Sequence, residues 1–202
     1  MTMKSGVRCP VAATMVLIGV SSVWGLSTQA QSSQDLVRQL ESPASTTAAS
    51  RKLFKIAGSD HDLRLQLGTA LPTIIEPGPT PNSRQVWLNA VRLAGGLKIA
   101  EAAPALTKWI GLSKTNVAYS MGQDENLYFS ETGRALVEIG EPAVPALREG
   151  LENSNPGVRT RASYALFLIN SPDAKNALRE HLAHEPDSSL AGYIKKRLAE
   201  NN

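Results

Sequence analysis

Residues 141–170 read EPAVPALREGLENSNPGVRTRASYALFLIN and predict two helices separated by one break. Pro142 stands in the first turn of a helix, where proline is tolerated because that amide has no helical hydrogen bond to donate. The break is residues 153–157 (NSNPG), and Asn170 can end the second helix in the left-handed conformation. Apolar residues follow helical spacing on both sides of the break, at Val144, Leu147 and Leu151 and then at Val158, Ala162, Ala165, Leu166 and Ile169.

This two-helix unit recurs along the chain. The motif of its second helix, at residues 165–170, occurs also at 135–140 and at 90–95. The motif of its first helix, at residues 147–151 (LREGL), occurs again at 178–182 (LREHL). Weaker copies of the first-helix motif lie at residues 36–40 and 106–110. Because one helix pair has too small a core to fold alone, the repetition predicts pairs stacked in a row.

The motifs at residues 143–147 (AVPAL) and 155–159 (NPGVR), with the alanines that follow them, resemble a HEAT repeat of the short, phycobilisome-lyase-like type. The resemblance is closest over residues 141–184 and weakest over 32–76. It implies an all-α fold, a short α-solenoid of about five antiparallel helix pairs in which one helix of each pair lines an inner surface. The best repeats span residues 84–184.

The two ends of the chain have separate predictions. Residues 1–30 have a positive start at Lys4 and Arg8, an apolar stretch at 11–26, and small residues before Gln31, which is typical of a cleavable signal peptide. An uncleaved membrane anchor is the alternative, although the apolar stretch is shorter than the roughly 20 residues of a membrane span. We therefore expect an exported domain of residues 31–202, periplasmic or extracellular, without a membrane span. Residues 187–200 are expected to form a C-terminal capping helix.

Charge and cysteine content exclude several functions for the exported domain. The chain has 21 basic and 18 acidic residues, and Lys4 and Arg8 are the only charged residues within 1–30. The domain that remains has a net charge of +1, so we expect no nucleic-acid partner. Cys9 is the only cysteine. A cleaved chain would therefore have no thiol for catalysis, disulfide exchange or metal binding.

An insertion at residues 111–124 explains why the copies of the second-helix motif at 90–95 and 135–140 are further apart than those at 135–140 and 165–170. Insertions in solenoids often lie on a binding face, and this one carries Tyr119 and Met121 as candidate contacts. The alternative is a loop that is tolerated because it disturbs nothing.

Arg148 and Arg179 occupy equivalent positions in successive repeats and are candidate contacts for an acidic partner, because arginine binds carboxylates with two parallel hydrogen bonds. Lys108 is a third basic candidate. Glu149 and Glu180 directly follow the two arginines, so a surface that neutralises itself is the alternative. A further arginine, Arg159, is expected to bond neighbouring loop carbonyls.

Trp87 and Trp109 lie on apolar helical faces and are expected in the core, with an exposed interface contact as the alternative.

The sequence contains no recognised catalytic or cofactor-binding motif, and we assign no catalytic, cofactor or metal residue. His181 and His184 are three residues apart and could share a helix face. A catalytic zinc ion takes three protein ligands, and Glu180 and Glu185 have no special spacing to supply the third. We therefore predict a solvated surface for both histidines. Gly95-Gly96 is interpreted as a helix end.

The repeat pattern favours a scaffold that binds another protein through its inner helices or through the insertion at residues 111–124. Two alternatives stay open. One is an enzyme or enzyme subunit, since some relatives with such repeats attach or detach bilin chromophores. The other is a structural part of an envelope assembly. The sequence does not name the partner.

Overall fold

The computed structural model of the protein describes residues 33–112 and 130–200, and these residues form helices without any strand. A helical segment at residues 33–40 comes first. The helices that follow are α2 (Thr46–Ile56), α3 (His61–Ile75), α4 (Arg84–Gly96), α5 (Ala103–Lys108), α6 (Glu131–Ile139), α7 (Val144–Leu151), α8 (Pro156–Ile169), α9 (Pro172–Leu182) and α10 (Ser188–Glu200). Single 3₁₀ turns, η1 (Ala100–Ala102) and η3 (Glu141–Ala143), precede α5 and α7.

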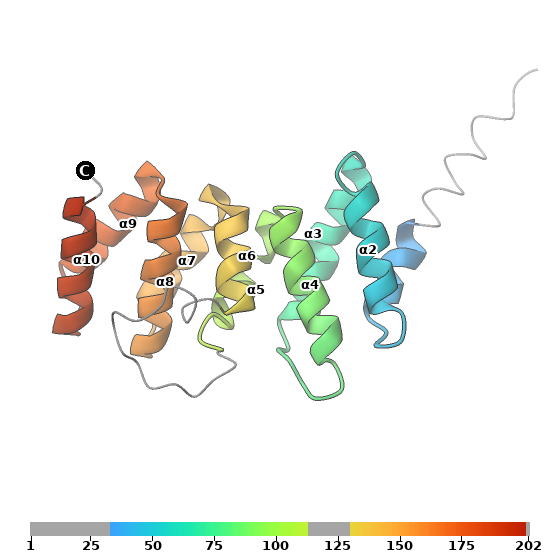
Figure 1. Ribbon diagram of the computed structural model, residues 1–202, viewed down its shortest axis with the longest axis horizontal. Helices are drawn as coiled ribbons and strands as arrows, with labels where there is room; N and C mark the ends of the chain where they lie inside the picture. The colour runs from blue at the N-terminus through green and yellow to red at the C-terminus, as the bar shows by residue number, and fades with distance from the viewer. Residues whose placement is uncertain (1–32, 113–129, 201–202) are drawn as a thin grey trace, which may run out of the picture.

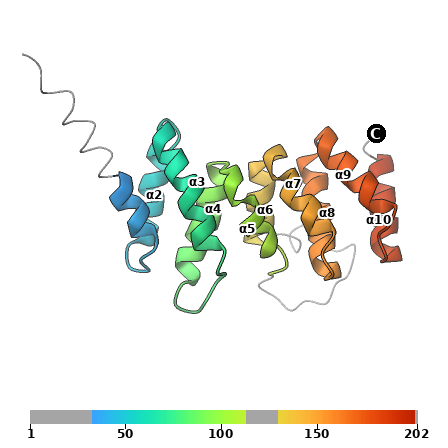
Figure 2. The same cartoon turned by 180° about the vertical axis from the view of Figure 1, so that it is seen from behind.

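The helices form two layers that run side by side along the molecule. Figure 1 shows α2, α4, α6, α8 and α10 as one row, in which each helix contacts the next. The view from behind shows α3, α5, α7 and α9 in the opposite row (Figure 2). From α3 onward, each helix also packs on a sequence neighbour in the other row. Counting the segment 33–40 with α2, the described residues hold five helix pairs, which confirms the predicted α-solenoid.

Local sequence signals set the helix ends. The side chains of Asp60, Ser130, Asn155 and Ser171 each accept a hydrogen bond from a backbone amide in the first turn of the helix that follows, which satisfies a donor without a helical partner. Asn170 ends α8 in the left-handed conformation with φ of 53°, as predicted. Helices α8 and α9 are therefore joined by Asn170 and Ser171 alone, which holds the two helices side by side.

The core is a continuous band of apolar side chains between the two rows. Its largest fully buried members are leucines and isoleucines from helices along the whole row, from Leu40 to Leu151. Trp87 is buried and its indole N–H donates to the carbonyl of Ile75, which confirms the expected core position. Trp109 is half-buried and packs on Gly78, and its N–H donates to the carbonyl of Glu76.

Gly95 does more than end α4. A Cβ atom at this position would lie 2.7 Å from the Cα atom of Ala135 and 2.5 Å from the carboxylate of Glu138, both on α6. The interpretation of this glycine as a helix end alone is therefore incomplete. The missing side chain lets α4 and α6 pack closely. This contact joins α2 and α4, which precede the insertion, to α6, α8 and α10, which follow it in the same row.

Two predicted features lie outside the described residues. These are the signal peptide at residues 1–30 and, except for Gly111 and Leu112, the insertion at residues 111–124. Among the helices that the structure describes, none is both long enough and apolar enough to cross a bilayer.

Candidate functional site

Five charged or titratable side chains meet where α7, α8 and α9 come together, and we call them the histidine–carboxylate cluster. Glu152 follows the last residue of α7, and Arg159 lies in the first turns of α8. His181 lies in the last turn of α9, and His184 and Glu185 lie in the loop before α10. The cluster therefore draws its members from two successive repeats.

A buried ion pair forms the base of this cluster. Arg159 donates from Nε and Nη2 to the carboxylate of Glu185 at distances between 2.8 and 3.2 Å. The Arg159 side chain is 9% exposed and that of Glu185 is 0% exposed. Arg159 Nη1 also donates to the carbonyls of Asn153 and Ser154, as the sequence predicted. Because nearly all its donors have partners, these hydrogen bonds offset the desolvation cost of burying the guanidinium.

Glu185 stays ionised in this environment. Burial by itself raises the pKa of the Glu185 carboxyl, but hydrogen bonds from Arg159, from the Asp187 amide and from His181 outweigh burial and lower the pKa to about 2. The carboxylate is therefore a fixed negative charge at neutral pH, and it can only accept hydrogen bonds.

His181 lies between two carboxylates. Its Nε2 is 2.5 Å from Oε2 of Glu185, and its Nδ1 is 3.2 Å from Oε1 of Glu152. Since Glu185 is ionised, the proton of the first hydrogen bond belongs to Nε2, which donates it. The ring is 3% exposed. The prediction of a solvated surface is therefore wrong for His181, which is buried against Glu185 of the loop before α10.

His184 and Glu152 form the outer, solvent-exposed side of the cluster. His184 Nε2 lies 3.1 and 3.3 Å from the two oxygens of Glu152. The side chains of His184 and Glu152 are 55% and 60% exposed, so the predicted solvated position holds for His184. The hydrogen bond from His184 lowers the pKa of the Glu152 carboxyl, and the bond from His181 adds to this effect. Glu152 is therefore ionised and shared by both rings.

Three of these side chains are placed as metal ligands could be. One ligand atom each from Glu152, His181 and His184 lies within 4.8 Å of the other two. The sequence predicts no metal ligand, because candidates for a third ligand such as Glu180 and Glu185 have no special spacing. The structure turns Glu180 toward Arg148 and holds Glu185 against Arg159.

The position of Glu152 could have been found from the repeat spacing. The first-helix motif at residues 147–151 corresponds to the copy at 178–182, and α7 and α9 lie side by side. The same register places residue 152 opposite residue 183, between the two histidines. Spacing within one helix does not reveal this ligand, whereas the spacing from one repeat to the next does.

Three of the predicted partner-binding residues, Lys108, Arg148 and Arg179, lie in one row of helices, and each has a partner within this chain. Arg148 on α7 pairs with Glu180 on α9, so the self-neutralising alternative holds for this arginine. Arg179 donates to Asn176 within α9 at 3.0 Å. Lys108 on α5 lies 2.5 Å from the carboxylate of Glu76. The remaining candidates, Tyr119 and Met121, lie outside the described residues, and partner binding by all five stays a prediction.

Comparisons with known proteins give one family match. Residues 130–192 match the family model of HEAT repeats, and no curated protein matches the chain. One similar solved structure is an engineered protein of the Northeast Structural Genomics Consortium, with 20% identity, a TM-score of 0.45, and coverage of 91% of this chain and 84% of that one.

A second similar structure is a designed armadillo repeat protein in complex with the peptide (KR)4, with 15% identity, a TM-score of 0.31, and coverage of 83% of this chain and 98% of that one. At these TM-scores neither structure supports an inference about this chain. The family match covers α6 to α9 and the start of α10, and so includes the histidine–carboxylate cluster. Residues 130–192 therefore match HEAT repeats, and the same row of paired helices continues before them.

Proposed function

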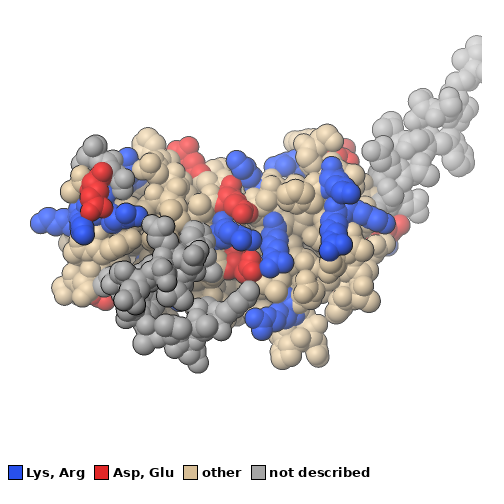
Figure 3. All heavy atoms as spheres, in the orientation of Figure 1, with Lys and Arg blue, Asp and Glu red and all other residues tan. Residues whose placement is uncertain are grey.

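We propose that the protein is a non-catalytic scaffold that binds an acidic segment of another protein across the exposed face of α2 and α4. The observation that carries this proposal is the charge of these two adjacent helices. Together they contain five basic residues and no acidic residue: Arg51, Lys52, Lys55, Arg84 and Arg92. Figure 3 has lysine and arginine side chains gathered over α2 and α4.

The seam between α2 and α4 also carries an exposed aromatic ring. Asn89 on α4 donates to the hydroxyls of Thr46 and Thr47 on α2, which fixes how the helices align. Further along the same seam, the ring of Phe54 packs on Gly96 and is still 51% exposed. An exposed apolar ring on a helix that also carries three cations suits a segment with both acidic and apolar side chains.

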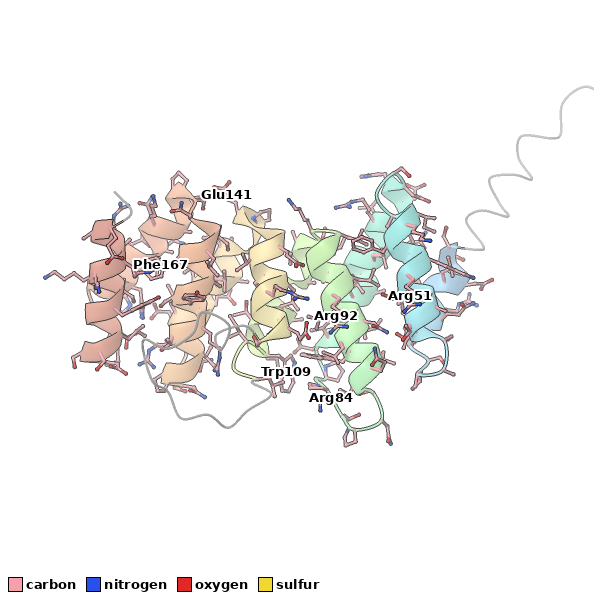
Figure 4. All side chains as sticks on the ribbon, viewed as in Figure 1. Arg51, Arg84, Arg92, Trp109, Glu141 and Phe167 are labelled. Atoms are coloured by element: carbon pink, nitrogen blue, oxygen red, sulfur yellow. The ribbon has the colours of Figure 1, made fainter. Side chains whose placement is uncertain are left out.

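Most of these cations are available to a partner. No ion pair joins Arg51, Lys52, Lys55 or Arg84 to an acidic side chain in residues 33–112 and 130–200, whereas Arg92 reaches Glu131 at 3.0 Å. Arginine side chains bind carboxylates with two parallel hydrogen bonds. Figure 4 places Arg51 on α2, and Arg84 and Arg92 on α4, along the same side of the molecule.

This face differs from the one favoured by the sequence. Lys108, Arg148 and Arg179 belong to α5, α7 and α9 in the other row, where Lys108 and Arg148 already bind carboxylates of this chain. A paired side chain must break its own contact before it binds a partner. On the α2–α4 face this cost applies to Arg92, and the other four basic residues have no acidic partner among the described residues. The insertion at residues 111–124 stays a second predicted contact.

The test is binding of a fluorescein-labelled peptide of alternating glutamate and leucine, followed by fluorescence anisotropy. We expect saturable binding that weakens as salt rises from about 50 to about 300 mM, because exposed charges are screened. Arg51→Glu with Lys55→Glu should weaken binding about tenfold or more, since close charge pairs of opposite sign become like-charge pairs. The matched control is Lys195→Glu with Lys196→Glu on α10, which makes the same change of charge on a different helix.

Three results would contradict this function. They are absence of peptide binding, equal losses in both double variants, and tighter binding of duplex DNA or of anionic vesicles than of the peptide. Absence of peptide binding would exclude the α2–α4 face as a binding site for acidic segments. Equal losses would show that binding depends on net charge alone. Tighter binding of DNA or vesicles would assign the basic face to a different class of partner.

We also propose that the chain is exported to the periplasm or beyond the cell. The support is the charge and apolar pattern of residues 1–30. N-terminal sequencing of the protein isolated from its native cells tests this directly. A first residue near Gln31 is expected, and a chain that starts at Met1 would exclude export by cleavage.

A further inference from the structure

We propose that Glu152, His181 and His184 form a binding site for one divalent transition-metal ion of the zinc type. The site would join two successive repeats, because Glu152 follows α7 while the histidines belong to α9 and the loop after it. This site is separate from the α2–α4 face and involves none of its residues.

The distances among the three ligands already approach those of metal coordination. Tetrahedral zinc with bonds of about 2.0–2.1 Å separates its ligand atoms by about 3.3–3.4 Å. Oε1 of Glu152 lies 3.2 Å from Nδ1 of His181 and 3.1 Å from Nε2 of His184. The two rings are nearly perpendicular, at 84°, with centroids 5.0 Å apart. Both nitrogens thus face the same carboxylate oxygen from different directions.

The surroundings of His181 are those of a metal-binding histidine. Such a ring commonly donates its second N–H to a carboxylate, which fixes the ring orientation and leaves the other nitrogen free for the metal. Here Nε2 donates to Glu185, and Arg159 holds Glu185 in turn with two nitrogens. His181 therefore presents Nδ1 to the site from a buried and fixed position, and a bound ion would replace the Nδ1 proton that the Glu152 carboxylate accepts.

The outer ligands allow an ion to enter. The side chains of Glu152 and His184 are more than half exposed, so they can move by the small amount that closes the ligand set. Two imidazoles and one carboxylate favour zinc, copper or nickel over calcium and magnesium, which prefer oxygen ligands. With three protein ligands, a tetrahedral ion keeps one position for water or for a carboxylate of a partner.

Calorimetric titration of the untagged chain with zinc chloride near pH 7 tests the proposal. We expect one zinc ion per chain, with an affinity that falls about tenfold or more in His184→Ala and in Glu152→Gln. His61→Ala is the matched control, because His61 is exposed at the start of α3 and is the one other histidine of the sequence. Circular dichroism should be the same for all variants, since the three substituted side chains are exposed.

A second measurement locates the ion independently. In long-range ¹H–¹⁵N spectra of the imidazoles, zinc should shift Nδ1 of His181 and Nε2 of His184 and leave His61 unchanged. Calcium at the same concentration should shift none of them. Failure of the wild type to bind zinc, retention of binding in both His184→Ala and Glu152→Gln, or an equal loss in His61→Ala would each overturn the site.

Discussion

At the scale of single residues, Arg159 has the largest structural role in the histidine–carboxylate cluster. Its guanidinium closes the loop between α7 and α8 through two carbonyls and holds Glu185 from the next repeat. Arg159 therefore holds the loop of its own repeat and a carboxylate of the neighbouring repeat in place. Lysine could not replace it, because a single ammonium cannot match the planar fork that two carbonyls and one carboxylate require.

Substitution of Arg159 by leucine should be strongly destabilising. The variant leaves the Glu185 carboxylate buried without its partner, and removal of one member of a buried pair costs about 3–5 kcal/mol. We expect a fall of that size in the free energy of unfolding, measured by urea denaturation. Arg134→Leu is the comparison, because Arg134 is 55% exposed and its surface pairs with Glu131 and Glu138 contribute about 1 kcal/mol or less. Equal losses in both variants would contradict the role given to Arg159.

The lowered pKa of Glu185 predicts a loss of stability in acid. Its pKa is 4.5 in the unfolded reference and about 2 in the folded chain, so the unfolded state binds more protons between these values. The stabilisation is therefore complete above the unfolded value and is lost as the pH falls toward 2. The slope from this one group is at most about 1.4 kcal/mol per pH unit.

Comparison with Glu185→Gln isolates this group. The variant should be less stable than the wild type near neutral pH, because Arg159 loses its anion. The difference between the two proteins should shrink as the pH falls from about 5 toward 2. Urea denaturation across this range measures it. Two stability curves that stay parallel would mean that Glu185 does not titrate as its surroundings require.

At the scale of helices, the contact between α4 and α6 depends on a missing side chain. Gly95 lets α6 approach so closely that a Cβ atom would meet the backbone of Ala135 at 2.7 Å. Backbone cannot rotate away as a side chain can, so the two helices would have to separate. The repeats are joined across the insertion by this close contact as well as by apolar burial.

Gly95→Ala should therefore destabilise the protein by about 1–3 kcal/mol, the usual cost of overpacking. Gly192→Ala on α10 is the matched control, because nothing lies within 4 Å of a Cβ atom there. Alanine is the better helix former, so this control should gain about 0.5–1 kcal/mol. Thermal and urea unfolding of both variants give the comparison, and a stable Gly95→Ala protein would refute the close contact.

At the scale of the whole molecule, stability is spread along a row of helix pairs. From α3 onward, each helix contacts its partner and the adjacent members of its own row, and the described core runs as one band from the segment 33–40 to α10. In such an array the stability is approximately a sum of contributions from each repeat and from each interface between neighbours. A repeat in the middle has two such interfaces, and a repeat at the end has one.

Hydrogen exchange should report this difference. We expect slower exchange in α4, α6 and α8 than in α10, because the last pair opens with the loss of one interface. Leu190→Ala on α10 should accelerate exchange in α9 and α10 alone. Leu136→Ala on α6, where the leucine is equally buried, should accelerate exchange on both sides. Uniform acceleration by both substitutions would mean that the chain unfolds as one unit.

The sequence by itself determined the repeat, the helix ends and the core, because these depend on residues within about one turn of each other or on a fixed repeat spacing. Asn170 in the left-handed conformation and the buried Trp87 are found as predicted, whereas α8 begins at Pro156, inside the break predicted for residues 153–157. Arg159 bonds the loop carbonyls because its partners lie five and six residues away, within reach of a local prediction.

The tertiary structure decided which charged groups meet. Glu152 and His181 belong to different repeats, as do Arg159 and Glu185, so no local pattern joins either pair. Their pairing follows from the packing of α7 beside α9, because this packing brings side chains of one repeat next to side chains of the following repeat. For the same reason the exposed basic face belongs to α2 and α4 together. Helix α3 lies between them in the sequence, but α2 and α4 are neighbours in the folded row.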